Sequence, residues 1–401
     1  MGPLAQWLEL PAHNRTVLGS SPRRPTIYFT PLAQRSERDS YKAVVLGSIP
    51  RGRTTKGEMR LSYYLFRDSL SFDDVLLEPK YSDIESRKEI DLSTQIGTTT
   101  AIDLSFPVVS SPMDTVTESE MASAMHRAGG LGIIHRYNTI EAQCEAVTGA
   151  SAKNVGAAIG VTGDFEERAC ALFDAGATVL CVDIAHGHHI LMKKALHRLK
   201  SIFEDTVHIM AGNVATLRAF NDLADWGADS IRVGIGGGSI CSTRIMTGHG
   251  IPTFQSVLDC SRSDRDAAII ADGGIRTCGD IAKALAAGAE AVMLGSMLSG
   301  TDESPGEIFR VDGKPFKTYR GMASKEAQIQ WRGHVSSEEG VAYRSPYKGP
   351  VTDTLELVKK SLQSSFSYSG VKNMKEFRYN SLFTKITQSG MAESKPHILQ
   401  K

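Results

Sequence analysis

The stretch Asp229-Ser-Ile-Arg-Val-Gly-Ile-Gly-Gly-Gly-Ser-Ile-Cys241-Ser-Thr-Arg244 organises the rest of the chain. Its first five residues predict a short buried strand. Four glycines in the next five residues let backbone amides and carbonyls approach a ligand, because no Cβ is in the way. Such amides can hold a phosphate, and carbonyls of the same loop can surround a cation. We therefore predict that Cys241 lies beside an anion site at the end of a strand, where an α/β barrel places its chemistry.

Repeated strand–helix units predict an α/β fold from residue 71 onward. Four helical stretches end in a glycine that leads directly into the next strand, as a left-handed glycine at a helix end would. Eight units in succession favour a closed (β/α)8 TIM barrel over the alternative, a doubly wound open sheet. The strands are expected at 107–111, 132–135, 155–160, 179–185, 208–213, 230–236, 268–273 and 291–296, and the helices include 118–128, 165–175, 217–226 and 280–287.

Polar and glycine residues follow six of the eight expected strands. Any one of these groups alone is most simply a turn, but six at the same edge of a barrel indicate a site. Gly273-Gly274 and Gly295-Ser296 follow the seventh and eighth strands, where barrels commonly bind phosphate. Together with Ser239 they could form one phosphate cup, and Asp272 could accept hydrogen bonds from a ribose diol. The implied ligand is a nucleoside monophosphate whose base lies over Cys241.

Composition excludes several classes of protein. The 401 residues carry 45 basic and 45 acidic side chains, so no global field attracts nucleic acid or a membrane surface. Six cysteines occur without CxxC pairs or zinc-like spacing, which is typical of a reduced, cytoplasmic protein. No apolar run approaches the length of a membrane span, and the N-terminus lacks the layout of a signal peptide.

Residues 1–58 differ from the rest and predict a disordered extension rich in Arg, Ser, Pro and Thr. Pro3-Leu-Ala-Gln6 recurs as Pro31-Leu-Ala-Gln34, and Val17-Leu-Gly-Ser20 recurs as Val45-Leu-Gly-Ser48. Translated transfer-RNA genes give this kind of sequence, so we hypothesise a misassigned start codon and a native start near Met59. An alternative hypothesis is a basic arm that binds RNA.

Several long motifs resemble the IMP dehydrogenase/GMP reductase family over residues 68–398. They are Ser71-Phe-Asp-Asp-Val-Leu-Leu-Glu-Pro79, Ser111-Pro-Met-Asp114, Gly236-Gly-Gly-Ser-Ile-Cys241, Ala271-Asp-Gly-Gly-Ile-Arg276, Val292-Met-Leu-Gly-Ser296 and Tyr319-Arg-Gly-Met322. The resemblance implies one catalytic barrel domain over 59–401, with a flap at about 323–346 and a C-terminal segment. It also implies a homotetramer that acts on the purine nucleotides GMP or IMP.

The resemblance also implies roles for individual residues. Cys241 would attack C2 of the purine as the nucleophile, with Thr243 relaying a proton. Asp183 and Asn213 would face the nicotinamide cofactor or the reacting base. Carbonyls of Gly236, Gly238 and Cys241 would bind K⁺ or another monovalent cation. The implied nucleotide contacts are Ser111, Met113, Ser239, Asp272, Gly273, Gly274, Gly295, Ser296, Tyr319, Gly321 and Met322.

Two features favour GMP reductase, with NADPH as reductant, over IMP dehydrogenase, which would use NAD. Only a short stretch separates the second and third expected strands, which leaves no room for the pair of CBS modules that family dehydrogenases usually carry. The expected flap lacks the Arg-Tyr pair that activates water in dehydrogenases. Glu326, one position later than the usual acid of a reductase, is the candidate partner of Thr243. A third hypothesis, a nucleotide-binding regulator without activity, is disfavoured by the intact Cys241 and Thr243.

Overall fold

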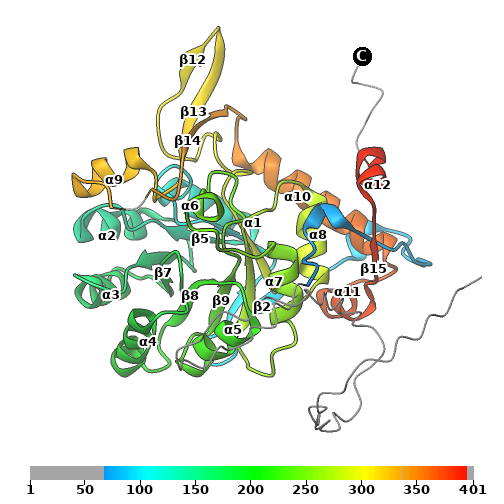
Figure 1. Cartoon of the computed structure of the whole chain (residues 1–401), viewed down its shortest axis with the longest axis horizontal. Coiled ribbons are helices and arrows are strands. Elements are labelled where there is room, and N and C mark those ends of the chain that lie inside the picture. The colour runs from blue at the N-terminus through cyan, green and yellow to red at the C-terminus, as the bar shows by residue number, and fades with distance from the viewer. Residues whose placement is uncertain (1–66, 337, 395–401) are drawn as a thin grey trace, which may run out of the picture. The chain divides into compact units, whose positions relative to one another are not determined.

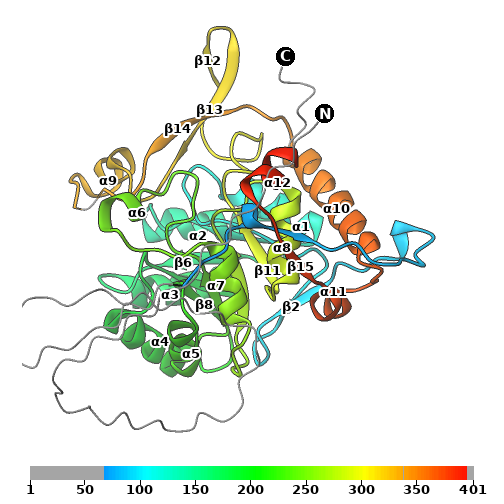
Figure 2. The ribbon, with the colours of Figure 1, turned by 45° about the vertical axis from the view of Figure 1, so that its right-hand side comes forward.

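Eight parallel strands close into a barrel in the computed structural model, which describes residues 67–336 and 338–394 (Figures 1 and 2). The order around the barrel is β4-β5-β6-β7-β8-β9-β10-β11, with β11 returning to pair with β4. This confirms the predicted α/β barrel and excludes the open sheet. The strands are β4 (Val108–Ser110), β5 (Leu131–Ile134), β6 (Gly156–Ile159), β7 (Val179–Asp183), β8 (His208–Val214), β9 (Ser230–Val233), β10 (Ala268–Asp272) and β11 (Ala291–Leu294).

Two apolar clusters hold the barrel together. One fills its interior, where side chains from alternate strand positions meet, and the other lies between the strands and the surrounding helices. The hairpin of β2 (Thr94–Ile96) and β3 (Ile102–Leu104) contributes Ile96, Ile102 and Leu104 to the interior cluster. Because both faces of each barrel strand are buried, the strands are nearly continuous apolar runs.

Helices connect successive strands on the outside of the barrel. Four of them end at a glycine with φ between 89° and 121°, namely Gly129, Gly176, Gly227 and Gly288, as the sequence predicted. The connecting helices are α1 (Ser119–Ala128), α2 (Ile140–Gly149), α3 (Phe165–Asp174), α4 (Ile190–Phe203), α5 (Leu217–Asp225), α6 (Thr243–Thr247), α7 (Thr253–Cys260) and α8 (Cys278–Ala286).

Additional elements surround the barrel. A three-stranded sheet of β12 (Phe309–Val311), β13 (Lys314–Arg320) and β14 (Ala342–Pro346) projects from it and carries helix α9 (Lys325–Arg332) between β13 and β14 (Figures 1 and 2). The sequence prediction did not include this sheet. The remaining elements are η1 (Phe72–Asp74), β1 (Val75–Leu77), η2 (Arg87–Glu89), α10 (Val351–Tyr368), α11 (Met374–Asn380), β15 (Phe383–Lys385) and α12 (Gln388–Glu393).

Within the described residues, no helix is both long enough and apolar enough to cross a membrane. The proposed extension 1–58 and the proposed start at Met59 lie outside the described residues.

Candidate active site

A cavity of about 490 Å³ opens at the carboxyl ends of the barrel strands. The loops that follow β4, β5, β7, β9, β10 and β11 all contribute to its wall, together with Asn213 of β8, the β13–α9 turn and residues 339–340 of the flap. Among the sequence-predicted site residues, those that line this cavity are Ser111, Met113, Asp183, Asn213, Gly236, Gly238, Ser239, Cys241, Thr243, Asp272, Gly273, Gly274, Gly295, Ser296, Tyr319, Gly321 and Met322.

The predicted nucleophile stands at one end of a short hydrogen-bonded chain. The thiol of half-buried Cys241 donates to Thr243 Oγ1 at 3.2 Å, and the Thr243 hydroxyl donates to Glu339 Oε2 at 2.8 Å. A thiol, a hydroxyl and a carboxylate in this order can move a proton to or from a group bound at the sulfur.

Glu326 does not take the place that the sequence analysis gave it. It is exposed on α9 and is absent from the cavity wall, whereas Glu339, thirteen residues later, reaches Thr243. Glu326 was the candidate because it lies close to the Gly-Met motif in sequence. No local sequence pattern indicates which later part of the flap returns to the cysteine loop.

Backbone pairing explains why Glu339 lies there. Ser242 N donates to the Glu339 carbonyl at 2.9 Å, and Glu339 N donates to the Ala323 carbonyl at 3.2 Å. Two residues on, Val341 N donates to the Ile240 carbonyl at 3.0 Å. The segment 339–341 therefore lies like a strand between the cysteine loop and the turn after β13. A Cβ at Gly340 would lie 3.1 Å from Ser324 N, so this crossing is tight.

The loops after β10 and β11 form a cradle at the place where the sequence predicts a phosphate cup. Gly273 and Gly274 have φ of 86° and 77°, which favours glycine. A Cβ on Gly295 would lie 2.9 Å from Tyr319 Oη and 3.1 Å from Ser111 Oγ, so a side chain there would fill the space between these hydroxyls. Burial raises the pKa of Tyr319 to about 12, which keeps its hydroxyl a neutral donor.

The Ser111 hydroxyl adds an independent sign of a ligand. Its Oγ is buried and has no hydrogen-bond partner within the described part of the chain. Buried hydroxyls are nearly always paired, because leaving one unpaired costs about 1–3 kcal/mol. A bound phosphate or ribose oxygen in this cradle would satisfy it.

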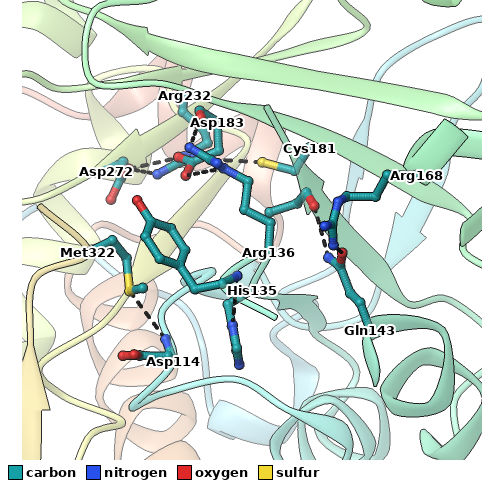
Figure 3. A network of polar contacts seen from close by, with 12 residues as sticks. Asp114, His135, Arg136, Gln143, Arg168, Cys181, Asp183, Arg232, Asp272 and Met322 are labelled. Carbon is teal, nitrogen blue, oxygen red and sulfur yellow. Dashed lines mark hydrogen bonds and ion pairs between the residues drawn. The ribbon is translucent and has the colours of Figure 1, made fainter. Parts of the chain in front are cut away.

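Arg232 is a site residue that the sequence analysis missed (Figure 3). Its guanidinium is buried on β9 between two carboxylates: Nη1 donates to Asp183 Oδ1 at 2.5 Å, and Nε and Nη2 donate to Asp272 Oδ2 at 3.1 and 2.8 Å. Asn213 Nδ2 donates to the same Asp272 oxygen at 2.8 Å. Burial disfavours the charge of Arg232, but Asp272 and Asp183 outweigh it and raise its pKa above the usual value. An arginine within an apolar strand was the available signal.

A second arginine contacts Asp183. Arg136, in the loop after β5, donates from Nη2 to the Asp183 carbonyl at 3.2 Å, and its Nε lies 3.8 Å from Asp183 Oδ2. Its guanidinium also lies over the Tyr137 ring, 5.1 Å from the centroid, and burial raises the pKa of that tyrosine. Asp183 is thus fixed by two cations and cannot swing freely into the cavity.

The predicted cation site consists of backbone carbonyls only. Gly236 has a φ of 78°, and the Gly238 carbonyl accepts a hydrogen bond from Cys241 N at 3.1 Å. The described residues contain no group of three or more His, Cys, Asp or Glu side chains suited to a metal ion. A hard monovalent cation held by carbonyls fits this turn, while a transition metal does not.

Comparison with known proteins gives one consistent result. Residues 69–397 match the family model described as the IMP dehydrogenase / GMP reductase domain. Inosine-5′-monophosphate dehydrogenase of Nitrosopumilus maritimus is 36% identical, and GMP reductase of Leishmania major 33% identical; each match covers 83% of this chain and 98% of the relative. A solved structure of a cysteine-to-alanine variant of GMP reductase from Trypanosoma brucei, in complex with guanosine 5′-monophosphate, superposes with a TM-score of 0.79 at 31% identity. It covers 83% of this chain and 98% of that one. The chain therefore belongs to the IMP dehydrogenase/GMP reductase family.

Proposed function

We propose that this protein is a GMP reductase, which catalyses GMP + NADPH + H⁺ → IMP + NADP⁺ + NH₃. The observation that carries the proposal is the line from Cys241 through Thr243 to Glu339 at the lip of a cavity with a mononucleotide cradle. The structurally similar Trypanosoma brucei GMP reductase was solved with GMP, which supports a purine mononucleotide as ligand.

Cys241 starts the reaction by bonding through its sulfur to C2 of GMP. The C2 amino group then leaves as ammonia and takes a proton from the Thr243 hydroxyl, which Glu339 replenishes. When bound, the reduced nicotinamide supplies the hydride that C2 receives. The Cys241 thiolate then leaves, so that the purine is released as IMP and the thiolate is regenerated.

The cradle residues hold the nucleotide in this scheme. Glycines 273, 274 and 295 with Ser239, Ser296 and Tyr319 take the phosphate, and Asp272 takes the ribose diol. Arg232 donates both of its hydrogen bonds with Asp272 to Oδ2, which fits a role of Oδ1 toward the ribose. Ser111, Met113, Gly321 and Met322 complete the contacts to the nucleotide.

The cofactor side has the groups that a nicotinamide carboxamide needs. Asp183 and Asn213 offer a carboxylate and an amide near the ends of the neighbouring strands β7 and β8, and the two arginines fix Asp183. NADPH is proposed over NADH as the natural form. K⁺ on the carbonyls of Gly236, Gly238 and Cys241 would stiffen the cysteine loop, and we propose a cytoplasmic homotetramer.

IMP dehydrogenase is the alternative, and the short β5–β6 connection does not by itself exclude it. The alignments with the Nitrosopumilus dehydrogenase and the Leishmania reductase extend over 472 and 482 positions, longer than the 401 residues of this chain. Relatives of both names thus contain residues that this chain lacks. The choice of reductase rests on the flap, which contains no Arg-Tyr pair.

An absorbance assay separates the two activities. Purified protein with K⁺, GMP and NADPH should lose the absorbance of reduced nicotinamide and release ammonia and IMP in equal amounts. A gain of that absorbance with IMP and NAD⁺, and no reaction in the first mixture, would establish the dehydrogenase instead. Binding of GMP without turnover in either mixture would support the inactive regulator.

A further inference from the structure

The side chain of Arg320, at the end of β13, joins the loop after β4 to helix α9 of the flap. Its Nε and Nη2 donate to Asp114 Oδ2 at 3.0 and 2.5 Å, and Nη2 also donates to Gln330 Oε1 at 2.7 Å. Asp114 follows β4, whereas Gln330 belongs to α9 of the flap. The side chains of Arg320 and Asp114 are only 16% and 12% exposed, so water and salt screen this ion pair weakly.

The Asp114 end of this link reaches the proposed nucleotide contacts. Asp114 N donates to Met322 Sδ at 3.4 Å (Figure 3), and Arg320 N donates to Thr115 Oγ1 at 3.2 Å. Residues on both sides of Arg320, namely Tyr319 and Gly321, line the cavity. The loop after β4 and the end of β13 are therefore tied to each other where both meet the nucleotide.

The Gln330 end reaches the flap. The next residue, Trp331, packs against Tyr137 with ring centroids 6.0 Å apart, and Tyr137 lies beneath the guanidinium of Arg136. Glu339 is carried by the same flap, beyond α9. Packing of α9 against the barrel (its seating) therefore connects three parts of the proposed site. These are the nucleotide contacts, the Arg136–Asp183 pair proposed to face the cofactor, and Glu339, which accepts the hydrogen bond from Thr243.

We propose that Arg320 is a positioning residue that couples binding of a purine mononucleotide to the seating of α9, and thereby to the placement of Glu339. The inference rests on the proposed function for the identity of the ligand and for the role of Glu339. A nucleotide that fixes Met322 also fixes Asp114, whose amide donates to the Met322 sulfur. The planar guanidinium of Arg320, with several donors, then holds Gln330 in place relative to Asp114. Oδ1 of Asp114 is buried without a partner in the described part of the chain, so Arg320 supplies the compensating charge.

Trp331 provides a direct optical probe of this coupling. We expect GMP, and equally IMP, to change the Trp331 emission of the full-length protein, with Trp331→Phe removing the response and Trp226→Phe retaining it. In Gln330→Ala, which deletes only the flap end of the link, the response should shrink and kcat should fall roughly threefold, as expected for one exposed hydrogen bond. In Arg320→Gln, kcat should fall about tenfold or more while the KM for NADPH changes less than twofold.

Two matched variants complete the test. Arg310→Gln alters an exposed arginine that donates to the Gly313 carbonyl of the same hairpin, and it should behave as wild type. Arg320→Lys should fold, because the lysine can pair with Asp114. Its change in Trp331 emission should nevertheless be smaller than that of the wild type, because an ammonium lacks the planar fork of donors. If Gln330→Ala and Arg320→Lys both keep the kcat and the change in Trp331 emission of the wild type, the coupling is overturned. It is also overturned if the wild-type protein turns over GMP without any change in Trp331 emission. If neither GMP nor IMP binds, the proposed function fails and the coupling fails with it.

Discussion

At the scale of single residues, the proposed chemistry depends on which carboxylate accepts the hydrogen bond from Thr243. The proximity of Cys241 and Thr243 was predictable from sequence, because Thr243 follows Cys241 by two residues. Their partner was not, because Glu339 is 96 positions from Thr243 and arrives through backbone pairing. Arg232 was missed for a related reason: its role depends on carboxylates contributed by β7 and β10.

Substitution of Glu339 and of Glu326, each by glutamine, tests which of the two carboxylates serves Thr243. Glu339→Gln should lower kcat by about 10²–10⁴-fold, the usual contribution of a general acid or base, while GMP still binds. Glu326→Gln is the matched control and should retain wild-type turnover, because this side chain is exposed outside the cavity. Steady-state kinetics with GMP and NADPH measure both. A large loss in Glu326→Gln with an active Glu339→Gln would reverse the assignment.

Replacement of the proposed nucleophile, Cys241, should separate GMP binding from turnover. Cys241→Ala should bind GMP with an affinity near that of wild type and show no turnover, because the covalent step is lost while the cradle stays intact. Calorimetric titration with GMP and the absorbance assay provide the two measurements. Turnover by the alanine variant at more than about one thousandth of the wild-type rate would contradict nucleophilic catalysis by this cysteine.

At the scale of elements, the fit of helices against the barrel follows from small residues. The barrel was predictable because eight apolar runs alternate with helical stretches, each a local pattern. The β12–β14 sheet was not, since β13 pairs with β14 across the intervening flap helix and its strands carry many polar, exposed residues. Local patterns reveal elements that bury an apolar face, and this sheet buries little.

Gly132 in β5 illustrates how closely helix and strand approach. A Cβ there would lie 2.5 Å from the Ala122 Cα of helix α1. Gly132→Ala should therefore push α1 outward and lower the free energy of unfolding by about 1–3 kcal/mol, as overpacking does. Gly149→Ala, at the end of α2, has its nearest neighbour at 3.3 Å, at the hydroxyl of a side chain, and serves as control. Equal urea midpoints for the two variants would contradict this packing argument.

At the scale of the whole molecule, stability should depend on pH through a histidine inside the barrel. His208 is 1% exposed at the start of β8, with Nδ1 2.9 Å from the Thr100 carbonyl and Nε2 2.7 Å from Ser230 Oγ. Burial lowers its pKa, an effect that the hydrogen bond to the Thr100 carbonyl and the nearby Asp229 partly offset. Below about pH 6.5 the unfolded chain therefore binds a proton that the folded chain refuses.

The free energy of unfolding should consequently fall as the pH drops below about 6.5, by up to roughly 1.4 kcal/mol per pH unit from this residue. Urea unfolding between pH 7.5 and 5.5 measures the slope. His208→Gln should flatten it, whereas His197→Gln, on the exposed side of α4, should leave it unchanged. A slope that is the same in wild type and His208→Gln would show that other groups dominate.

The strand-like segment 339–341, held between the cysteine loop and the turn after β13 by main-chain hydrogen bonds, has a broader implication. Main-chain hydrogen bonds depend little on side-chain type, so position 339 can carry a different side chain while the backbone of this segment stays in the same position. Under the proposed function, the flap can therefore present a different proton donor to the same covalent adduct without any change in the barrel. The direction of purine conversion would then depend on the flap rather than on the barrel that supports it.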